Sequence, residues 1–212
     1  MDAAAPATLV LLVRHGQTPT TGRELPGRAP GLHLSDHGWA QAGHVAERIS
    51  ALPVDALYAS PLERAQETAR PASRALGLPV AVEPGLLEGD FGTWTGRSLA
   101  ELNALPEWEA VQRRPSTFRF PGGESFAEMQ ARMGETVDRL RARHEGGTIV
   151  CVSHADPIRL HLARELGTPL DAFQRISVAP GSVSAISCAA GRDPVVLTVS
   201  STSASLAELV PS

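Results

Sequence analysis

The sequence has only two cysteines in 212 residues, too few for a disulfide framework in a chain of this size. Cys151 lies in an apolar stretch and Cys188 in an alternating one, so we expect both thiols to be small core side chains. No group of Cys or His residues has the spacing of zinc ligands. We therefore expect neither a metal ion nor a cofactor to be bound.

Long apolar runs and runs of like charge are also missing. No apolar stretch approaches the roughly 20 residues of a transmembrane helix, and residues 1–7 lack the basic region and long apolar core of a secretory signal. We expect a cytoplasmic protein without a membrane partner. The net charge of −4, with no basic run, argues against nucleic acid as a partner, so an anionic substrate would require a local cationic site.

The length and composition fit one sizeable core. A chain of 212 residues is long for one domain and short for two, and 42% hydrophobic with 20% charged residues is typical of a soluble globular protein. We expect a single domain over residues 1–212. Between about residues 83 and 123 the regular pattern loosens, with Gly, Pro and aromatic residues interspersed, and this part is predicted to form a small inserted cap lobe.

The stretch from Val10 to Thr18 changes from an unbroken apolar run to a polar turn that contains Arg14 and His15. A continuous Val and Leu run is typical of a strand that is covered on both faces in a parallel sheet. Since α/β sheets bind ligands beyond the carboxyl ends of such strands, Arg14 and His15 are predicted to lie at a ligand site. Residues 148–153 form a second run of this kind, and His154 follows it directly.

Capping residues mark where the predicted helices begin. Ser or Asp can accept a hydrogen bond from the free N–H groups of a first helical turn, and proline is tolerated at the first helical position. Helix starts are predicted at Ser35, Ser60–Pro61, Ser98, Ser125 and Asp156–Pro157. The second of these places Arg64 in the first turn of a helix that Gly77 ends.

The remaining segments complete an α/β pattern. Residues 56–60 and 80–82 are typical of short strands, and Ser182–Cys188 with Val195–Val199 predicts an antiparallel hairpin at a sheet edge. The Ser- and Ala-rich tail from Ser200 is predicted to be loosely held. The predicted fold is α/β: a three-layer α/β/α sandwich with a mostly parallel central sheet, an antiparallel edge and the inserted cap lobe.

Topology brings four chemically active side chains to one sheet edge: Arg14, His15, Arg64 and His154. Guanidinium groups match phosphate oxygens and keep their charge, and the helix N-termini add oriented N–H groups. A histidine held neutral by a hydrogen bond at one ring nitrogen is a nucleophile at the other. The four residues therefore predict a dianion pocket in which His15 could attack a bound phosphoryl group.

Five ordered motifs resemble those of the histidine phosphatase superfamily, branch 1, also called the phosphoglycerate-mutase-like family. The motifs are Leu12–Thr18, Ser60–Ala69, Leu87–Gly96, Phe120–Ser125 and Val152–His154. The resemblance implies that His15 becomes a phosphohistidine and that Arg14, Arg64 and His154 bind the phosphoryl oxygens. Glu88 would protonate the leaving oxygen and then activate water, which requires a raised carboxyl pKa. The implied activity is metal-independent hydrolysis of a small phosphorylated metabolite.

Other residues near these motifs have weaker signals. Gln17 and Thr18 follow the predicted nucleophile and are candidate substrate-binding residues, although Thr18 could equally cap a turn. The chain departs from the family at Pro19–Thr21, where asparagine is often found, and at Ala155–Asp156, where glycine is common. The aromatic residues of the predicted cap lobe either line a substrate site or pack within the lobe: Trp94, Trp108, Phe118 and Phe120.

Two alternative functions remain open. A phosphomutase would return the phosphoryl group to its substrate, and only Arg113 and Arg114 favour it, because mutases of the family usually have a larger basic insertion. A non-catalytic phospho-ligand or protein-binding module would keep the pocket without turnover. The sequence does not identify the substrate, and it leaves a homodimer possible.

Overall fold

The computed structural model describes residues 7–203 and 205–209 of the chain. Its strands are β1 (Thr8–Arg14), β2 (Ala56–Ala59), β3 (Val80–Val82), β4 (Thr148–Ser153), β5 (Val183–Cys188) and β6 (Val195–Ser201). Its α-helices are α1 (Asp36–Ile49), α2 (Glu63–Leu76), α3 (Leu99–Asn103), α4 (Trp108–Arg113), α5 (Phe126–Arg143) and α6 (Ala155–Glu165). Short 3₁₀ helices occupy Pro84–Leu86, Gly92–Trp94, Pro115–Thr117, Leu170–Arg175 and Ala207–Leu209. Among the described residues, no helix has the length and apolar character needed to cross a membrane.

A six-stranded sheet in the order β3-β2-β4-β1-β5-β6 forms the centre of the molecule. The pairs β1–β4, β2–β4 and β2–β3 are parallel, whereas β5 pairs antiparallel with both β1 and β6. β1 and β4 are apolar and buried almost throughout, as strands covered on both faces must be. The predicted α/β class, mostly parallel sheet and antiparallel edge are confirmed.

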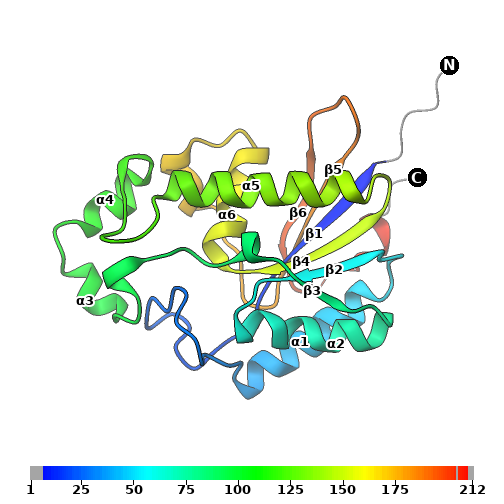
Figure 1. Ribbon diagram of the computed structural model, residues 1–212, viewed down its shortest axis with the longest axis horizontal. Helices are drawn as coiled ribbons and strands as arrows, with labels where there is room; N and C mark the ends of the chain where they lie inside the picture. The colour runs from blue at the N-terminus through cyan, green and yellow to red at the C-terminus, as the bar shows by residue number, and fades with distance from the viewer. Residues whose placement is uncertain (1–6, 204, 210–212) are drawn as a thin grey trace.

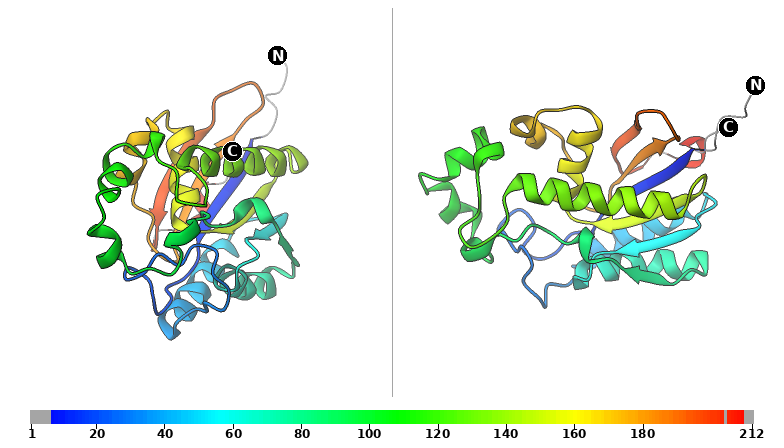
Figure 2. Two further views of the ribbon diagram at one scale, coloured as in Figure 1. Left: turned by 60° about the vertical axis from the view of Figure 1, so that its left-hand side comes forward. Right: turned by 45° about the horizontal axis from the view of Figure 1, so that its top comes forward.

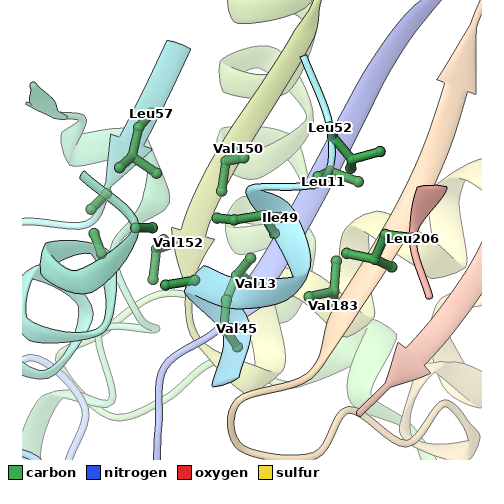
Figure 3. Close-up of a cluster of buried hydrophobic side chains, with 14 of the residues drawn as sticks. Leu11, Val13, Val45, Ile49, Leu52, Leu57, Val150, Val152, Val183 and Leu206 are labelled. Carbon is green, nitrogen blue, oxygen red and sulfur yellow. The ribbon is translucent and has the colours of Figure 1, made fainter. Parts of the chain in front are cut away.

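Helices cover both faces of this sheet, α1 and α2 on one face and α5 and α6 on the other (Figure 1). In the first of the two resulting cores, Val45 and Ile49 of α1 lie against Val13 and Val150 of the sheet (Figure 3). The second core contains both cysteines as free thiols, as predicted. The two cores hold the central strands from both sides and so fix where their ends lie.

The segment from residue 83 to 123 starts over the sheet, where Leu86 joins the second core, and continues with α3 and α4 beyond the carboxyl ends of β1 and β4 (Figures 1 and 2). It has an aromatic cluster of its own, in which Phe91, Trp94 and Phe120 join Phe126 of α5 and Phe173. These rings pack the segment against α5. The wall that it presents beyond the sheet edge is therefore part of a packed structure.

Two predicted helix starts are wrong. α2 begins at Glu63, not Pro61, and follows Leu62 without a side-chain cap. The Ser60 hydroxyl, which the sequence predicts as that cap, instead lies 2.8 Å from Nε2 of His154. α6 begins at Ala155, so Pro157 lies within the first turn, where its missing N–H costs no helical hydrogen bond. The predicted caps of the other helices are confirmed: Ser35, Ser98 and Ser125.

The prediction of a loosely held tail from Ser200 is also wrong for the residues that the structure describes. β6 continues to Ser201, whose carbonyl accepts a hydrogen bond from Arg48 over 2.9 Å. Leu206 is 1% exposed and belongs to the core between the sheet and α1. Leu209 packs against the same core, and burying a leucine side chain contributes about 1.5–3 kcal/mol, which holds this segment in place.

Candidate active site

The pairing register of β1 and β4 places two histidines side by side. Arg14, the last residue of β1, is opposite Ser153, the last residue of β4, and the N–H of His15 donates to the Ser153 carbonyl over 3.0 Å. His154 follows Ser153, so both imidazoles leave the sheet at the same level. Their ring centroids are 5.2 Å apart. The two strands that the sequence predicts to end in the site meet there.

The His15 imidazole is held neutral, with a lone pair left on one ring nitrogen. Its Nδ1 lies 2.7 Å from the carbonyl oxygen of Gly16. Because a carbonyl can only accept, Nδ1 carries the hydrogen and Nε2 keeps its lone pair. Burial, together with the positive charges of Arg64 and Arg14, lowers the pKa of His15 to about 3. The lone pair on Nε2 is therefore free at neutral pH.

Arg14 and Arg64 bring two cations with unused donors to this cluster. Arg64 is fully buried, and its Nη2 donates to the carbonyl of Gly27 over 2.7 Å. Arg14 Nη1 donates to the carbonyl of Val178 over 2.6 Å. Nε and Nη1 of Arg64 and Nε of Arg14 are buried and have no hydrogen-bond partner among the described residues. Unpaired buried donors are costly. A bound anion would supply the acceptors that these donors lack.

Ser60 orients His154. The Ser60 hydroxyl lies 2.8 Å from His154 Nε2, and the N–H of Leu62 donates to the same oxygen over 3.4 Å; we assign the hydroxyl as the donor to Nε2. Burial and the charge of Arg64 lower the pKa of His154 well below its usual value, which keeps the ring neutral. Its hydrogen then sits on Nδ1, a buried atom without a partner among the described residues. His154 thus offers a further free N–H beside His15.

The Ser60→Ala variant tests this orientation. Without the hydroxyl, the His154 ring can adopt its other tautomer, which turns a lone pair toward a bound anion. We expect the affinity for inorganic phosphate, measured by calorimetry, to fall about 10-fold, which corresponds to the roughly 1–1.5 kcal/mol of one hydrogen bond. Ser60→Thr, which keeps a hydroxyl, should restore the affinity. A lower melting temperature with unchanged affinity would mean that Ser60 serves packing alone.

Glu88 lies in the same buried cluster and is 8% exposed. Its Oε1 accepts the N–H of Gly89 over 2.9 Å. Burial, and after it the negative charge of Asp156, raises the pKa of Glu88 to about 7 against the opposing effects of the Gly89 hydrogen bond and the charges of Arg64 and Arg14. A carboxyl group with this pKa can give up a proton near neutral pH and take one back. The raised pKa that proton transfer requires is therefore present.

An ion pair on α6 lies next to this cluster. Asp156, predicted only as a helix cap, and Arg159, for which the sequence predicts no role, pair over 3.2 Å. Burial and, after it, the Arg159 charge lower the pKa of Arg14, whereas the Asp156 charge raises the pKa of both Arg14 and Glu88. The only sequence signal is their place, in the first residues after the strand that ends at Ser153.

Beside this ion pair is a cavity of 320 Å³. Trp108 and Phe120 line it together with Asp156 and Arg159, whereas Trp94 is 3% exposed and packs against other rings of the 83–123 segment. Of the aromatic residues named from the sequence, Trp108 and Phe120 therefore line the cavity, and Trp94 packs within the segment.

The structure places Gln17 and Thr18 in the loop after His15. The N–H of Gln17 donates to the side chain of Gln41 over 2.8 Å. Thr18 is buried, and its hydroxyl oxygen lies 3.0 Å from that of Thr21, which fits the turn-capping alternative. A contact of either residue with substrate stays a prediction.

The assembled site combines buried cationic N–H donors that lack partners among the described residues, a neutral imidazole and a carboxyl group with a raised pKa. In the part of the chain that the structure describes, no three His, Cys, Asp or Glu side chains are grouped so that they could hold a metal ion. The chemistry that these residues can perform is nucleophilic attack on a bound phosphoryl group, stabilised by fixed N–H donors.

Comparisons with known proteins connect this site to one family. The family model described as histidine phosphatase superfamily (branch 1) matches residues 10–201. Bifunctional protein Rv2228c of Mycobacterium tuberculosis is 40% identical over 167 residues, which are 76% of this chain and 45% of that protein. Phosphoserine phosphatase 1 of Hydrogenobacter thermophilus is 34% identical over 169 residues, which are 77% of this chain and 79% of that protein.

The fold comparison agrees with the sequence comparison. The crystal structure of phosphoserine phosphatase from Entamoeba histolytica, in complex with 3-phosphoglyceric acid, matches with a TM-score of 0.81 and 26% identity, over 92% of this chain and 98% of that one. The chain spans 45% of the length of the first curated relatives that it matches. From the family match over residues 10–201, the chain belongs to the histidine phosphatase superfamily, branch 1.

Proposed function

We propose that this protein hydrolyses phosphomonoesters without a metal ion, through a phosphohistidine on His15. The observation that carries the proposal is the set of buried N–H donors without partners among the described residues, on Arg14, Arg64 and His154, beside the neutral His15. The oxygens of a phosphoryl dianion supply the acceptors that these donors lack. The same donors stabilise the charge on those oxygens during transfer.

In the first step, His15 Nε2 attacks phosphorus with its lone pair. The bond from phosphorus to the leaving oxygen breaks, and Glu88 gives its proton to that oxygen, so the alcohol leaves neutral. The hydrogen on Nδ1 stays bonded to the Gly16 carbonyl, 2.7 Å away, and this contact holds the ring in line with the bond that breaks.

In the second step, water attacks the phosphorus of the phosphohistidine. Glu88, now a carboxylate, takes a proton from the water, and the bond between Nε2 and phosphorus breaks. Inorganic phosphate leaves, and both His15 and Glu88 return to their starting forms. A pKa of about 7 suits Glu88 for both directions of transfer.

Two relatives support a small phosphorylated metabolite as the substrate. One is a phosphoserine phosphatase, and the other was solved with 3-phosphoglyceric acid. The phosphomutase alternative has no support from Arg113, because this residue is 77% exposed and pairs with Glu109 on its own helix.

A panel of phosphomonoesters tests the function. Purified protein in the presence of a chelator should release inorganic phosphate from sugar phosphates, phosphoserine, phosphoglycerates or aryl phosphates. Interconversion of phosphoglycerates without phosphate release would identify a mutase. Phosphate binding with neither turnover nor a covalent phosphoenzyme would identify a binding module.

Residues 83–123 form a cap in this proposal, and the 320 Å³ cavity receives the leaving group. Its wall has apolar side chains, including Leu99, Trp108 and Phe120, beside the Asp156–Arg159 pair. A wall of this kind favours a leaving group that has an apolar part over a small polyol, because each buried methylene contributes about 0.8 kcal/mol.

Paired alkyl phosphates test the cavity without changing the chemistry. Ethyl phosphate and 2-phenylethyl phosphate have leaving alcohols of similar basicity, so a difference in kcat/KM reports contacts with the wall. We expect the phenylethyl ester to react about 10- to 100-fold faster by kcat/KM. Trp108→Ala should remove most of this preference, whereas Trp39→Ala, on the exposed face of α1, should keep it. Equal rates for the two esters in the unmodified protein would contradict the assignment of the cavity.

A further inference from the structure

The segment that carries Glu88 has little regular structure, yet charged side chains bind its backbone at several points. The Glu88 carbonyl accepts from Arg28 Nε over 2.8 Å, and Arg132 Nη2 approaches it at 3.4 Å. Arg132 Nη1 donates to the carbonyls of Leu87 and Gly85 over 2.9 and 2.8 Å. Two guanidinium groups therefore hold residues 85–88 in one conformation.

Glu124 joins these two arginines. Its Oε1 lies 2.9 Å from both Arg132 Nε and Arg28 Nη2, and its Oε2 accepts from Arg132 Nη2 over 3.0 Å. The same Oε2 accepts the N–H of Asp90 over 3.1 Å. One carboxylate thus aligns both guanidinium groups and also binds the chain two residues after Glu88.

The three side chains are shielded from solvent, with exposed fractions of 30% for Arg28, 19% for Glu124 and 21% for Arg132. Burial alone would raise the pKa of Glu124, but the hydrogen bonds from Arg132 and Asp90 and the charge of Arg28 lower it. The carboxylate is therefore ionised at neutral pH, and its charge-assisted bonds are stronger than those of a neutral side chain.

The same group connects to the phosphate-binding side of the site. Arg28 follows Gly27, whose carbonyl accepts from Arg64 Nη2 over 2.7 Å. The loop that brings Arg28 to the Glu88 carbonyl is thereby attached to a cation of the anion pocket. A shift of this loop would move the proton donor relative to the phosphoryl group.

We propose that Arg28, Glu124 and Arg132 form an ionic clamp, whose role is to hold the backbone of Glu88 so that its carboxyl group meets the leaving oxygen. The inference rests on the proposed function, since it requires Glu88 to be the proton donor. All three are positioning residues, because their contacts are with backbone atoms, with one another and, for Arg28, with the Asp90 carboxylate over 3.9 Å.

The leaving group provides the test. An alkoxide leaving group needs a proton from Glu88, whereas 4-nitrophenolate leaves without one. In Glu124→Gln we expect kcat/KM for 2-phenylethyl phosphate to fall about 10- to 100-fold, and kcat/KM for 4-nitrophenyl phosphate to stay within about twofold. Inhibition by inorganic phosphate should be unchanged, because the anion pocket is intact.

Two further variants control this experiment. Glu128→Gln changes a carboxylate that pairs with Arg119 at the start of α5 and has no hydrogen bond or ion pair with residues 85–90 in the structure. In this variant kcat/KM for both esters should stay at the level of the unmodified protein. Arg28→Gln removes one of the two donors to the Glu88 carbonyl. It should give a smaller loss of kcat/KM with the same leaving-group dependence, and it provides the test if Glu124→Gln does not fold.

The outcomes separate the clamp from the proposed function. Equal losses on both esters, or weaker phosphate inhibition, in Glu124→Gln and Arg28→Gln would overturn the clamp and indicate general support of the pocket. Glu88→Gln, measured in parallel, tests the proton donor itself. If Glu88→Gln shows leaving-group dependence and the clamp variants do not, only the clamp is wrong. If Glu88→Gln shows no leaving-group dependence, the proton-donor role is wrong, and the clamp proposal, which requires that role, is wrong as well.

Discussion

The His15→Ala variant is expected to lose turnover of phosphomonoesters by about 10⁴- to 10⁶-fold, as happens when an enzyme loses its nucleophile. The loss is large because the remaining groups only bind and polarise the phosphoryl group. Arg14, Arg64 and His154 keep their donors in this variant, so inorganic phosphate should still bind. Catalysis and phosphate binding therefore separate at this residue.

Covalent labelling measures the same prediction directly. The unmodified protein, quenched during turnover of a ³²P-labelled substrate, should contain acid-labile, base-stable phosphate, and His15→Ala should contain none. His33→Ala is the matched control, because His33 is an exposed histidine that pairs with Glu67. Label that persists in His15→Ala would place the nucleophile elsewhere.

The second large effect is expected for Glu88→Gln. Glutamine keeps the size of the side chain but cannot give or take a proton, so kcat for an alkyl phosphate should fall about 10²- to 10⁴-fold. The inhibition constant for inorganic phosphate should change little by comparison. Equal losses of kcat and of phosphate affinity would remove the proton-transfer role and leave Glu88 as part of the binding pocket.

The pH dependence of kcat/KM gives an independent measure of Glu88. Burial and the charge of Asp156 raise its pKa to about 7, and the protonated form is needed to release the alcohol. kcat/KM should therefore fall as the pH rises through about 7. Below about pH 6 it should fall as well, because phosphomonoesters lose their second negative charge there. His15 adds no limb near neutral pH, since its pKa is about 3.

Two variants assign the alkaline limb. In Glu88→Gln the limb should vanish, and in Asp156→Asn it should move to lower pH, because one cause of the raised pKa is gone. A limb that keeps its position in both variants would belong to another group.

Much of the site could be predicted because its residues follow buried strands. An apolar run that ends in a polar residue marks both a strand and its carboxyl end, which is why His15 and His154 could be placed together before their pairing was seen. The parallel register of β1 and β4 then sets them at one level. Local capping signals were equally reliable where the cap bonds only its own helix, as at Ser125.

Prediction failed where a residue has a distant partner. Ser60 before Pro61 is a normal helix-cap signal, but its hydroxyl binds His154, 94 residues away. Leu206 lies in a Ser- and Ala-rich tail whose few apolar residues follow no periodic pattern, so the sequence does not indicate that it is buried. The sequence predicts no role for Arg28 or Glu124, and their meeting depends on how two loops fold.

The clamp also sets limits on how this chain can change in evolution. Half of the residues that line the cavity lie between Asp90 and Glu124. Both ends of that stretch are held together, since the N–H of Asp90 donates to the Glu124 carboxylate. Insertions or deletions within it can reshape the cavity while the chain on either side stays in place. New substrates can therefore be acquired by exchanging one loop, without rebuilding the site of proton transfer.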